Sequence, residues 1–133
     1  MNPKKVYTID QAFARRLGFN FSENKGRILE NIVYLELLRR GKEVYYHSVK
    51  KECDFVIKQG LDIVEAIQVA YQINVSNRER EYQGLQEAMH TYNLREGLLL
   101  SFNIEECFIP DTVGMKVLPV WEWLLTDHNT ITL

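Results

Sequence analysis

The sequence predicts an α/β domain in which a mixed central sheet is flanked by helices. Its expected centre is a pair of strands at 52–69, folded back through a Gly-containing turn, and a long helix at 22–40 precedes them. A second helix and two apolar strand candidates follow. The order is therefore helix, three strands, helix and two strands, with a short closing helix. That order is typical of a mixed sheet covered by helices.

Length and composition predict a single domain. A chain of 133 residues can bury roughly two-thirds of its unfolded surface in one core. Its 46% hydrophobic and 26% charged residues are typical of a soluble globular protein. We expect one domain over 1–133, with a lead-in strand and short helix in 1–21 and the core in 22–133.

The first long helix is expected at 22–40. Arg39 and Arg40 suit the negative end of the helix dipole, and Gly41 suits the left-handed conformation that ends many helices. Apolar residues surround most of the circumference, so the helix is expected to be largely buried.

Two glutamates on this helix receive different interpretations. Glu30 lies among apolar neighbours, where carboxylates are seldom buried without a partner. It is either paired with Arg27, half-exposed, or a functional carboxylate. Glu36 is expected to form surface ion pairs with Arg39 and Arg40, three and four residues further on.

The register of the hairpin at 52–69 decides which side chains share a face. A three-residue loop at 60–62 places Asp54 opposite Gln68, because antiparallel partners keep a constant index sum. The acidic and amide groups then share one face. The other face would carry the apolar side chains Cys53, Phe55, Ile57, Ile63, Ile67 and Val69.

A two-residue loop at 59–60 is the alternative. It would pair Asp54 with Glu65 and place Asp62 opposite Ile57, among apolar side chains. This is the less favourable register, because it turns a carboxylate toward the core.

The second helix is expected to begin at a capping box formed by Ser76 and Glu79 and to end near Asn93. Glu81 falls on the same stripe of this helix as Leu85 and other apolar residues. The remaining expected elements are strands at 43–47, 97–102 and 114–120 and a helix at 121–125.

Charge and cysteine usage exclude several classes of protein. A net charge of -2 argues against bulk coating of nucleic acid, so any nucleic-acid contact must be local. Cys53 and Cys107 lack metal-ligand spacing and are expected to be reduced packing residues. The apolar runs are too short for a signal peptide or a membrane span. We therefore expect a cytoplasmic protein with no membrane partner.

The chain has no P-loop, Rossmann glycine fingerprint, G-x-S-x-G elbow or H-E-x-x-H zinc helix. The residues that remain for chemistry are Glu30, Asp54 and Gln68. Their oxygens are of the type that binds Mg²⁺ or Mn²⁺ for phosphodiester hydrolysis.

A resemblance to a known family spans nearly the whole chain. The segments that carry it are 5–10, 26–31 with 36–37, 44–46, 52–56, 67–69 and 119–121. They resemble the PD-(D/E)XK, restriction-endonuclease-like nuclease superfamily. The closer likeness is to a nuclease-like domain that follows the ATPase module in many bacterial and archaeal AAA-type ATPases. The resemblance implies a core of a helix, three strands, a helix and another strand.

The resemblance also implies residue roles. Glu30 falls on the superfamily's helix carboxylate, Asp54 on its strand aspartate, and Gln68 on the acid of its E-x-K tripeptide. The lysine of that tripeptide is replaced by Ala70. Glutamine keeps a carbonyl ligand but removes a charge, and the missing lysine removes a group that stabilises charge on phosphate.

Two functions follow, and both stay open. One is a nuclease-like accessory domain with a degenerate metal site, which binds DNA or a protein partner without efficient catalysis. The other is an active Mg²⁺-dependent DNA endonuclease or exonuclease. DNA would be held by Lys50, Lys51, Arg78 and Arg80, and one of the two arginines could replace the missing cation. The loss of lysine favours the first. Expected partners are an ATPase module, in cis or in trans, and a second copy of the chain.

Overall fold

The computed structural model describes residues 21–104 and 114–126, and the expected lead-in elements and Cys107 lie outside them. Five strands form one sheet in the order β1-β2-β3-β4-β5. The first two pairings are antiparallel and the last two are parallel. The elements are α2 (Phe21–Arg39), β1 (Glu43–Ser48), β2 (Glu52–Gln59), β3 (Asp62–Ile73), α3 (Arg78–Thr91), β4 (Gly97–Ile104), β5 (Met115–Pro119) and α4 (Val120–Leu125). The predicted mixed sheet flanked by helices is confirmed.

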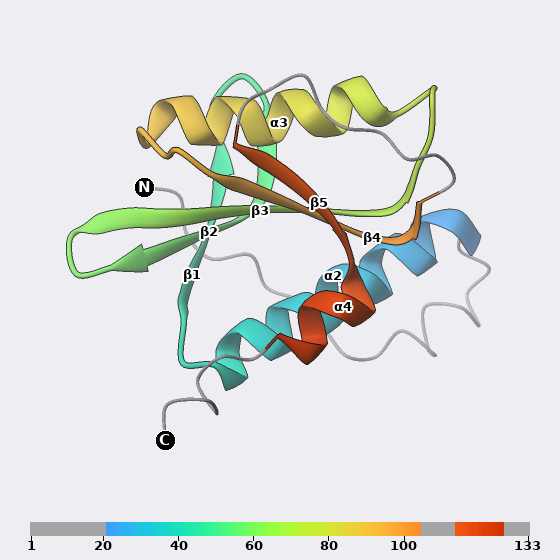
Figure 1. Cartoon of the computed structure of the whole chain (residues 1–133), viewed down its shortest axis with the longest axis horizontal. Coiled ribbons are helices and arrows are strands. Elements are labelled where there is room, and N and C mark those ends of the chain that lie inside the picture. Colours follow the sequence, from blue (N-terminus) through green and yellow to red (C-terminus); the bar gives the residue numbers. More distant parts are fainter. Residues whose placement is uncertain (1–20, 105–113, 127–133) are drawn as a thin grey trace.

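Helices cover both faces of the sheet (Figure 1). On one face, α2 and α4 pack against a core that includes Leu37, Phe55 and Trp123. On the other, α3 packs against a second core that includes Cys53, Val56 and Leu85. The helix α3 also makes the crossover between the parallel strands β3 and β4. No helix in the described ranges is both long and apolar enough to cross a membrane.

The C-terminal end of α2 agrees with the prediction, whereas the burial of the helix does not. Gly41 has a φ of +77°, as the left-handed position after a helix requires. Glu36 accepts hydrogen bonds from Arg39 at 2.7 Å and Arg40 at 2.8 Å. These guanidinium groups lower the pKa of Glu36 to about 2, and Arg39 has the larger effect. The expectation of a largely buried helix is wrong, because three apolar side chains are more than 40% exposed: Ile32, Leu35 and Leu38.

The hairpin of β2 and β3 has the predicted register at the end that carries Asp54. Phe55 pairs with Ile67, and the pairing keeps the index sum that places Asp54 level with Gln68. At Asp54 and Gln68, hydrogen bonds from backbone amides to the side chains of these two residues replace the backbone ladder. The alternative pairing of Asp54 with Glu65 is excluded, because Glu65 lies opposite Ile57.

The turn of this hairpin differs from both predictions. Gln59 pairs with Asp62, so the loop contains only Gly60 and Leu61. Gly60 has a φ of +66°, which the first residue of a type II′ turn requires. The register shifts by one residue between Ile57 and its neighbour, so β3 carries an extra residue that compensates for the shorter loop.

Two irregularities move Cys53 and Ile63 to the face opposite the predicted one. Both side chains belong to the core beneath α3, whereas Phe55 and Ile57 belong to the core beneath α2. A second register shift, in the pairing of β1 with β2, lies between Tyr45 and His47 and changes the facing of Cys53. An extra residue in one strand reverses the facing of every residue beyond it.

The capping box predicted for the second helix does not form. The Asn74 carboxamide oxygen accepts hydrogen bonds from the Ser76 hydroxyl at 2.6 Å and from the Asn77 amide at 3.1 Å. The Ser76 side chain is therefore directed to Asn74, and α3 begins after Asn77, without a side-chain cap. The Asn74 oxygen therefore holds the Ser76 hydroxyl in a local asparagine turn, away from the Glu79 amide that a cap would bind. The helix ends at Thr91, close to the predicted end.

Gly84 allows α3 to approach the sheet closely. A Cβ atom at this position would lie 2.2 Å from the Glu52 carbonyl oxygen. We expect Gly84→Ala to lower the free energy of unfolding by roughly 1–3 kcal/mol, because backbone must move. Urea denaturation measures the change. Gly26→Ala on α2 is the matched control, since a Cβ there meets nothing within 4 Å and should raise stability by about 1 kcal/mol. Equal effects of the two substitutions would contradict the close approach.

Candidate functional site

A pocket of about 430 Å³ lies where the pairing of β2 with β3 ends, and we call it the β2–β3 pocket. Its lining residues are Glu30, Lys50, Lys51, Glu52, Asp54, Gln68, Val69, Arg80 and Glu81. The three side chains predicted to carry oxygen chemistry therefore line one pocket. Three of the four predicted basic contacts line it too, and Arg78 does not.

Asp54 and Gln68 bridge the two strands at this point. The Asp54 amide donates to the Gln68 Oε1 at 2.9 Å, and the Val69 amide donates to the Asp54 Oδ2 at 2.9 Å. The Gln68 Nε2 in turn donates to the Glu81 Oε1 at 3.0 Å. These bonds continue the sheet where the backbone ladder stops. They also engage the same oxygens that would bind a metal.

Glu81 is a pocket residue that sequence reasoning did not select. Burial raises the pKa of the Glu81 carboxyl, and the nearby charge of Asp54 raises it further, against the lowering effects of Gln68 and Arg80. Of the four described carboxylate residues that line the pocket, Asp54 and Glu81 thus lie close enough for the charge of Asp54 to disfavour the ionisation of Glu81. A polar position within the apolar stripe of this helix was the available signal, but the stripe alone does not identify the partner.

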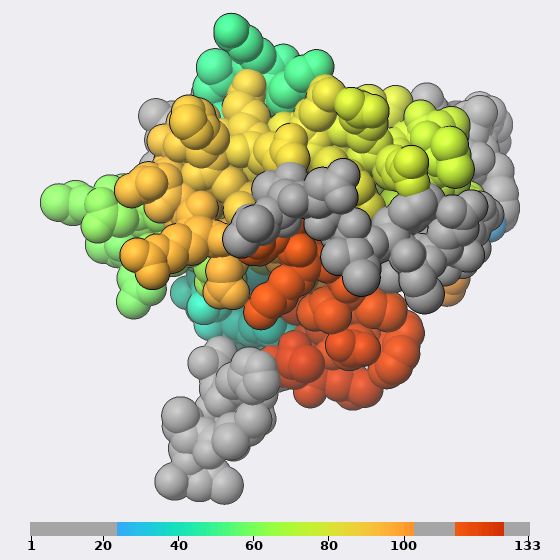
Figure 2. Space-filling model, turned by 45° about the horizontal axis from the view of Figure 1, so that its top comes forward, coloured from blue at the N-terminus to red at the C-terminus, as the bar shows by residue number. Residues whose placement is uncertain are grey.

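The basic side of the pocket is the turn between β1 and β2. The Lys51 amide donates to the Glu87 Oε2 at 3.0 Å, and the Lys50 amide donates at 3.3 Å. Burial raises the pKa of Glu87, but the bonds from Lys51 and His47 outweigh this effect and leave it below its usual value. The space-filling view shows this turn standing out above α3 (Figure 2).

A buried histidine holds Glu87 in place. His47 is fully buried, and its Nε2 lies 2.8 Å from the Glu87 Oε2. Its Nδ1 lies 2.9 Å from the Tyr92 hydroxyl, and the two rings meet edge to face. Because a carboxylate only accepts, Nε2 carries a proton in this arrangement. The network joins β1, α3 and the basic turn into one unit.

Position 70, where the resemblance places a lysine, belongs to the hydrophobic core. Ala70 is 8% exposed and packs in the core that includes Leu85 of α3. The strand therefore presents a methyl group to the helix here. Within residues 21–104 and 114–126, no three His, Cys, Asp or Glu side chains gather in a way that could hold a metal ion.

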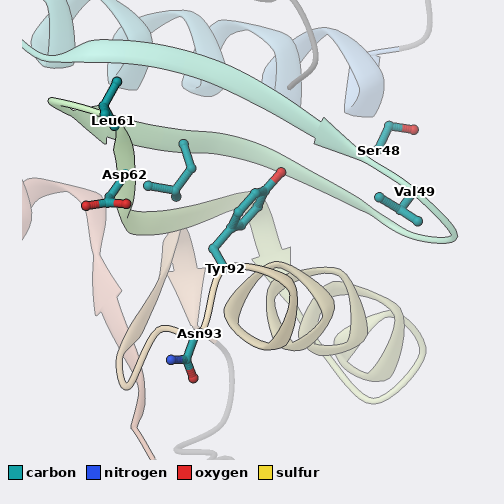
Figure 3. A pocket seen from close by; sticks show the side chains of 7 residues that line it. Ser48, Val49, Leu61, Asp62, Tyr92 and Asn93 are labelled. Atoms are coloured by element: carbon teal, nitrogen blue, oxygen red, sulfur yellow. The ribbon is translucent and has the colours of Figure 1, made fainter.

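A second hollow, of about 540 Å³, lies at the other end of α3. Figure 3 shows its lining side chains, which include Leu61, Asp62, Tyr92 and Asn93. The Tyr92 hydroxyl is already bonded to His47. Among the described residues, one carboxylate and no basic side chain line this hollow. The β2–β3 pocket is therefore the stronger candidate for chemistry.

Glu81 should make stability depend on pH. A carboxyl with a raised folded pKa contributes stability below its unfolded pKa, and this is lost as pH rises through the folded value. Glu81→Gln stays neutral and can still accept from Gln68, so we expect it to be more stable than the unsubstituted protein above that pKa and to lack this pH dependence. Urea denaturation across the acid to neutral range measures both effects.

The matched control is Glu79→Gln, which removes the same charge from the exposed first turn of α3. It should leave the Glu81-dependent slope in place. Parallel curves for Glu81→Gln and the unsubstituted protein would contradict the raised pKa.

Comparison with known proteins places the chain in a family. It is 38% identical to an uncharacterized protein of Methanocaldococcus jannaschii over 92% of this chain and 29% of that protein. It is 30% identical to an uncharacterized protein of Haemophilus influenzae over 91% of this chain and 28% of that protein. The chain thus spans less than a third of the length of these relatives. No solved structure matches it significantly. The family model described as Domain of unknown function (DUF4143) matches residues 25–123, and the chain belongs to that family.

Proposed function

We propose that the chain is a nuclease-like accessory domain of an AAA-type ATPase, which binds DNA at the β2–β3 pocket without efficient cleavage. One observation carries the proposal: Asp54 and Gln68 are hydrogen-bonded into the junction of β2 and β3, beside three basic side chains. By the resemblance, the pocket would correspond to the position of a nuclease site, while its oxygens hold the two strands together.

Weak catalysis follows from how these oxygens are used. A metal that activates water needs carboxylate oxygens directed toward it. Here one oxygen of Asp54 accepts from the Val69 amide, and the Gln68 carbonyl accepts from the Asp54 amide. The buried methyl group of Ala70 supplies no charge to a phosphate. Cleavage would require both a rearranged metal site and a cation from elsewhere.

Phosphate binding is supported by the basic side of the pocket. Lys50 and Lys51 occupy a turn that Glu87 holds against α3, and Arg80 extends from the first turns of the same helix. Cations held on separate elements around one pocket can neutralise successive phosphates of a nucleic-acid strand. The net charge of -2 makes this contact local, as a docking site for DNA.

The ATPase partnership rests on the resemblance and on a surface of α4. Relatives of this domain are more than three times as long as the part it matches. Trp121 is 60% exposed and Leu125 is 78% exposed, one turn apart on α4. An apolar face of this kind suits contact with an ATPase module, in cis or in trans, or with a second copy of the chain.

Glu81 favours the alternative of an active Mg²⁺-dependent DNA nuclease. It accepts a hydrogen bond from Gln68 and lies close enough to Asp54 for that charge to raise its pKa. With Glu30 and Glu52, four carboxylates among the described residues line the pocket. A divalent cation drawn between Asp54 and Glu81 would restore part of the charge that glutamine removes. Glu30 lines the same pocket, but it would have to move toward Asp54 and Glu81 to become a third oxygen ligand, because the three do not gather into a metal-holding group in this structure.

DNA binding should depend on the basic turn. We expect Lys50→Glu with Lys51→Glu to weaken binding to a DNA oligonucleotide and to reduce the slope of log affinity against log salt by roughly one for each phosphate that is no longer neutralised. Fluorescence anisotropy over a salt series gives both values. Lys42→Glu with Lys116→Glu makes the same charge change outside the pocket and should have a smaller effect. Equal losses in the two variants would argue for bulk charge.

Metal binding should rise when the missing charge is restored. Gln68→Glu places a third carboxylate beside Asp54 and Glu81, so we expect Mn²⁺ affinity to increase, as measured by calorimetry. DNA cleavage should stay near background, since Ala70 still supplies no cation. Gln83→Glu, at a half-buried position of α3 outside the pocket lining, is the control for added charge. Tight Mn²⁺ binding and cleavage by the unsubstituted protein would establish the alternative.

A further inference from the structure

Two aromatic rings stack beside the β2–β3 pocket. The rings of Tyr71 on β3 and Phe102 on β4 lie 5.1 Å apart at an interplanar angle of 11°. Tyr71 packs against the core beneath α2, and Phe102 is 59% exposed. The Lys25 ammonium of α2 lies 5.2 Å from the Tyr71 ring centroid. The pair is therefore anchored on one side, exposed on the other and accompanied by a cation.

This pair continues the α2 side of the pocket. Tyr71 lies two residues beyond Val69 on the same strand, and both are on the face covered by α2. Phe102 lies opposite the Tyr71 position on the neighbouring parallel strand, because Ala70 pairs with Ser101 and Gln72 with Asn103. Strand geometry puts Phe102 roughly 8 Å from Val69 along this face. A nucleotide strand with a phosphate in the pocket could place a base there.

We propose that Tyr71 and Phe102 form a stacking platform for an unpaired base, so that the domain prefers single-stranded DNA to duplex DNA. The inference rests on the DNA binding proposed above and adds its substrate class. Every base has a flat π-face, and an exposed aromatic ring binds it without regard to sequence. Bases within a duplex already stack on their neighbours, so the platform is useful only where a strand is unpaired.

The surroundings of the platform favour a nucleotide over an apolar segment of protein. The exposed part of the pair is the Phe102 ring, and the charges near it are the Lys25 ammonium and, in the pocket, three basic side chains beside four carboxylates. A flat ring beside cations matches the two parts of a nucleotide, the base and the phosphate. The Lys25 ammonium also reinforces the ring pair by a cation–π contact.

The test compares three ligands by fluorescence anisotropy: a single-stranded oligothymidylate, a duplex, and an oligonucleotide in which every base is absent. We expect the unsubstituted protein to bind the single strand most tightly. Phe102→Leu should weaken that binding roughly tenfold, because an aliphatic side chain gives no stacking. Phe102→Tyr should retain it. On the abasic strand, Phe102→Leu and the unsubstituted protein should bind alike, with unchanged salt dependence.

The outcomes separate the platform from the proposed function. If Phe102→Leu changes the affinity for neither the single strand nor the duplex, the platform is overturned and DNA binding stands. The same holds if Phe102→Leu lowers the affinity for the abasic strand as much as for the oligothymidylate. Binding to no DNA ligand overturns the proposed function and the platform together. Thermal melting verifies that each variant is folded. If Phe102→Leu does not fold, the comparison of Phe102→Tyr with Tyr71→Leu decides between these outcomes.

Discussion

Two side-chain hydrogen bonds hold β2 and β3 together at the place where their backbone ladder ends. The Asp54 carboxylate accepts a hydrogen bond from the Val69 amide of β3, and the Gln68 side-chain oxygen accepts one from the Asp54 amide of β2. Without them, two amide donors would be left unpaired in a half-buried part of the sheet, and an unpaired donor is costly. The β2–β3 pocket lies at this end of the ladder, and the two side chains join the strands where the backbone pairing stops.

The same bridge is the basis of the proposal that the pocket binds DNA without efficient cleavage. Acidic and amide side chains at a strand junction supply the kind of oxygen ligands that bind a metal ion. They can equally replace missing ladder bonds, and each oxygen used in this way is less available to a cation. Glu81 completes the bridge by accepting from Gln68, at the cost of a carboxyl that burial and Asp54 make harder to ionise.

Much of the fold could be predicted from local sequence. The apolar strands, the glycine after α2 and the register near Asp54 all depend on patterns within one or two elements, and the structure confirms them. The facing of Cys53 and Ile63 could not be predicted, because extra residues in a strand depend on packing against neighbours. Ser76 failed as a cap for a local reason, since Asn74 offered a competing acceptor.

The two outer strands of the described sheet limit how the domain can meet other molecules. At one edge, β5 has only five residues, ends at Pro119, which lacks an amide hydrogen, and carries Lys116. At the other, β1 pairs with its neighbour through a register shift. Short, charged or irregular edges are poor templates for strand addition. Within the described part of the chain, recognition by backbone pairing is therefore disfavoured, and the helices and turns, through their side chains, are left to make contacts.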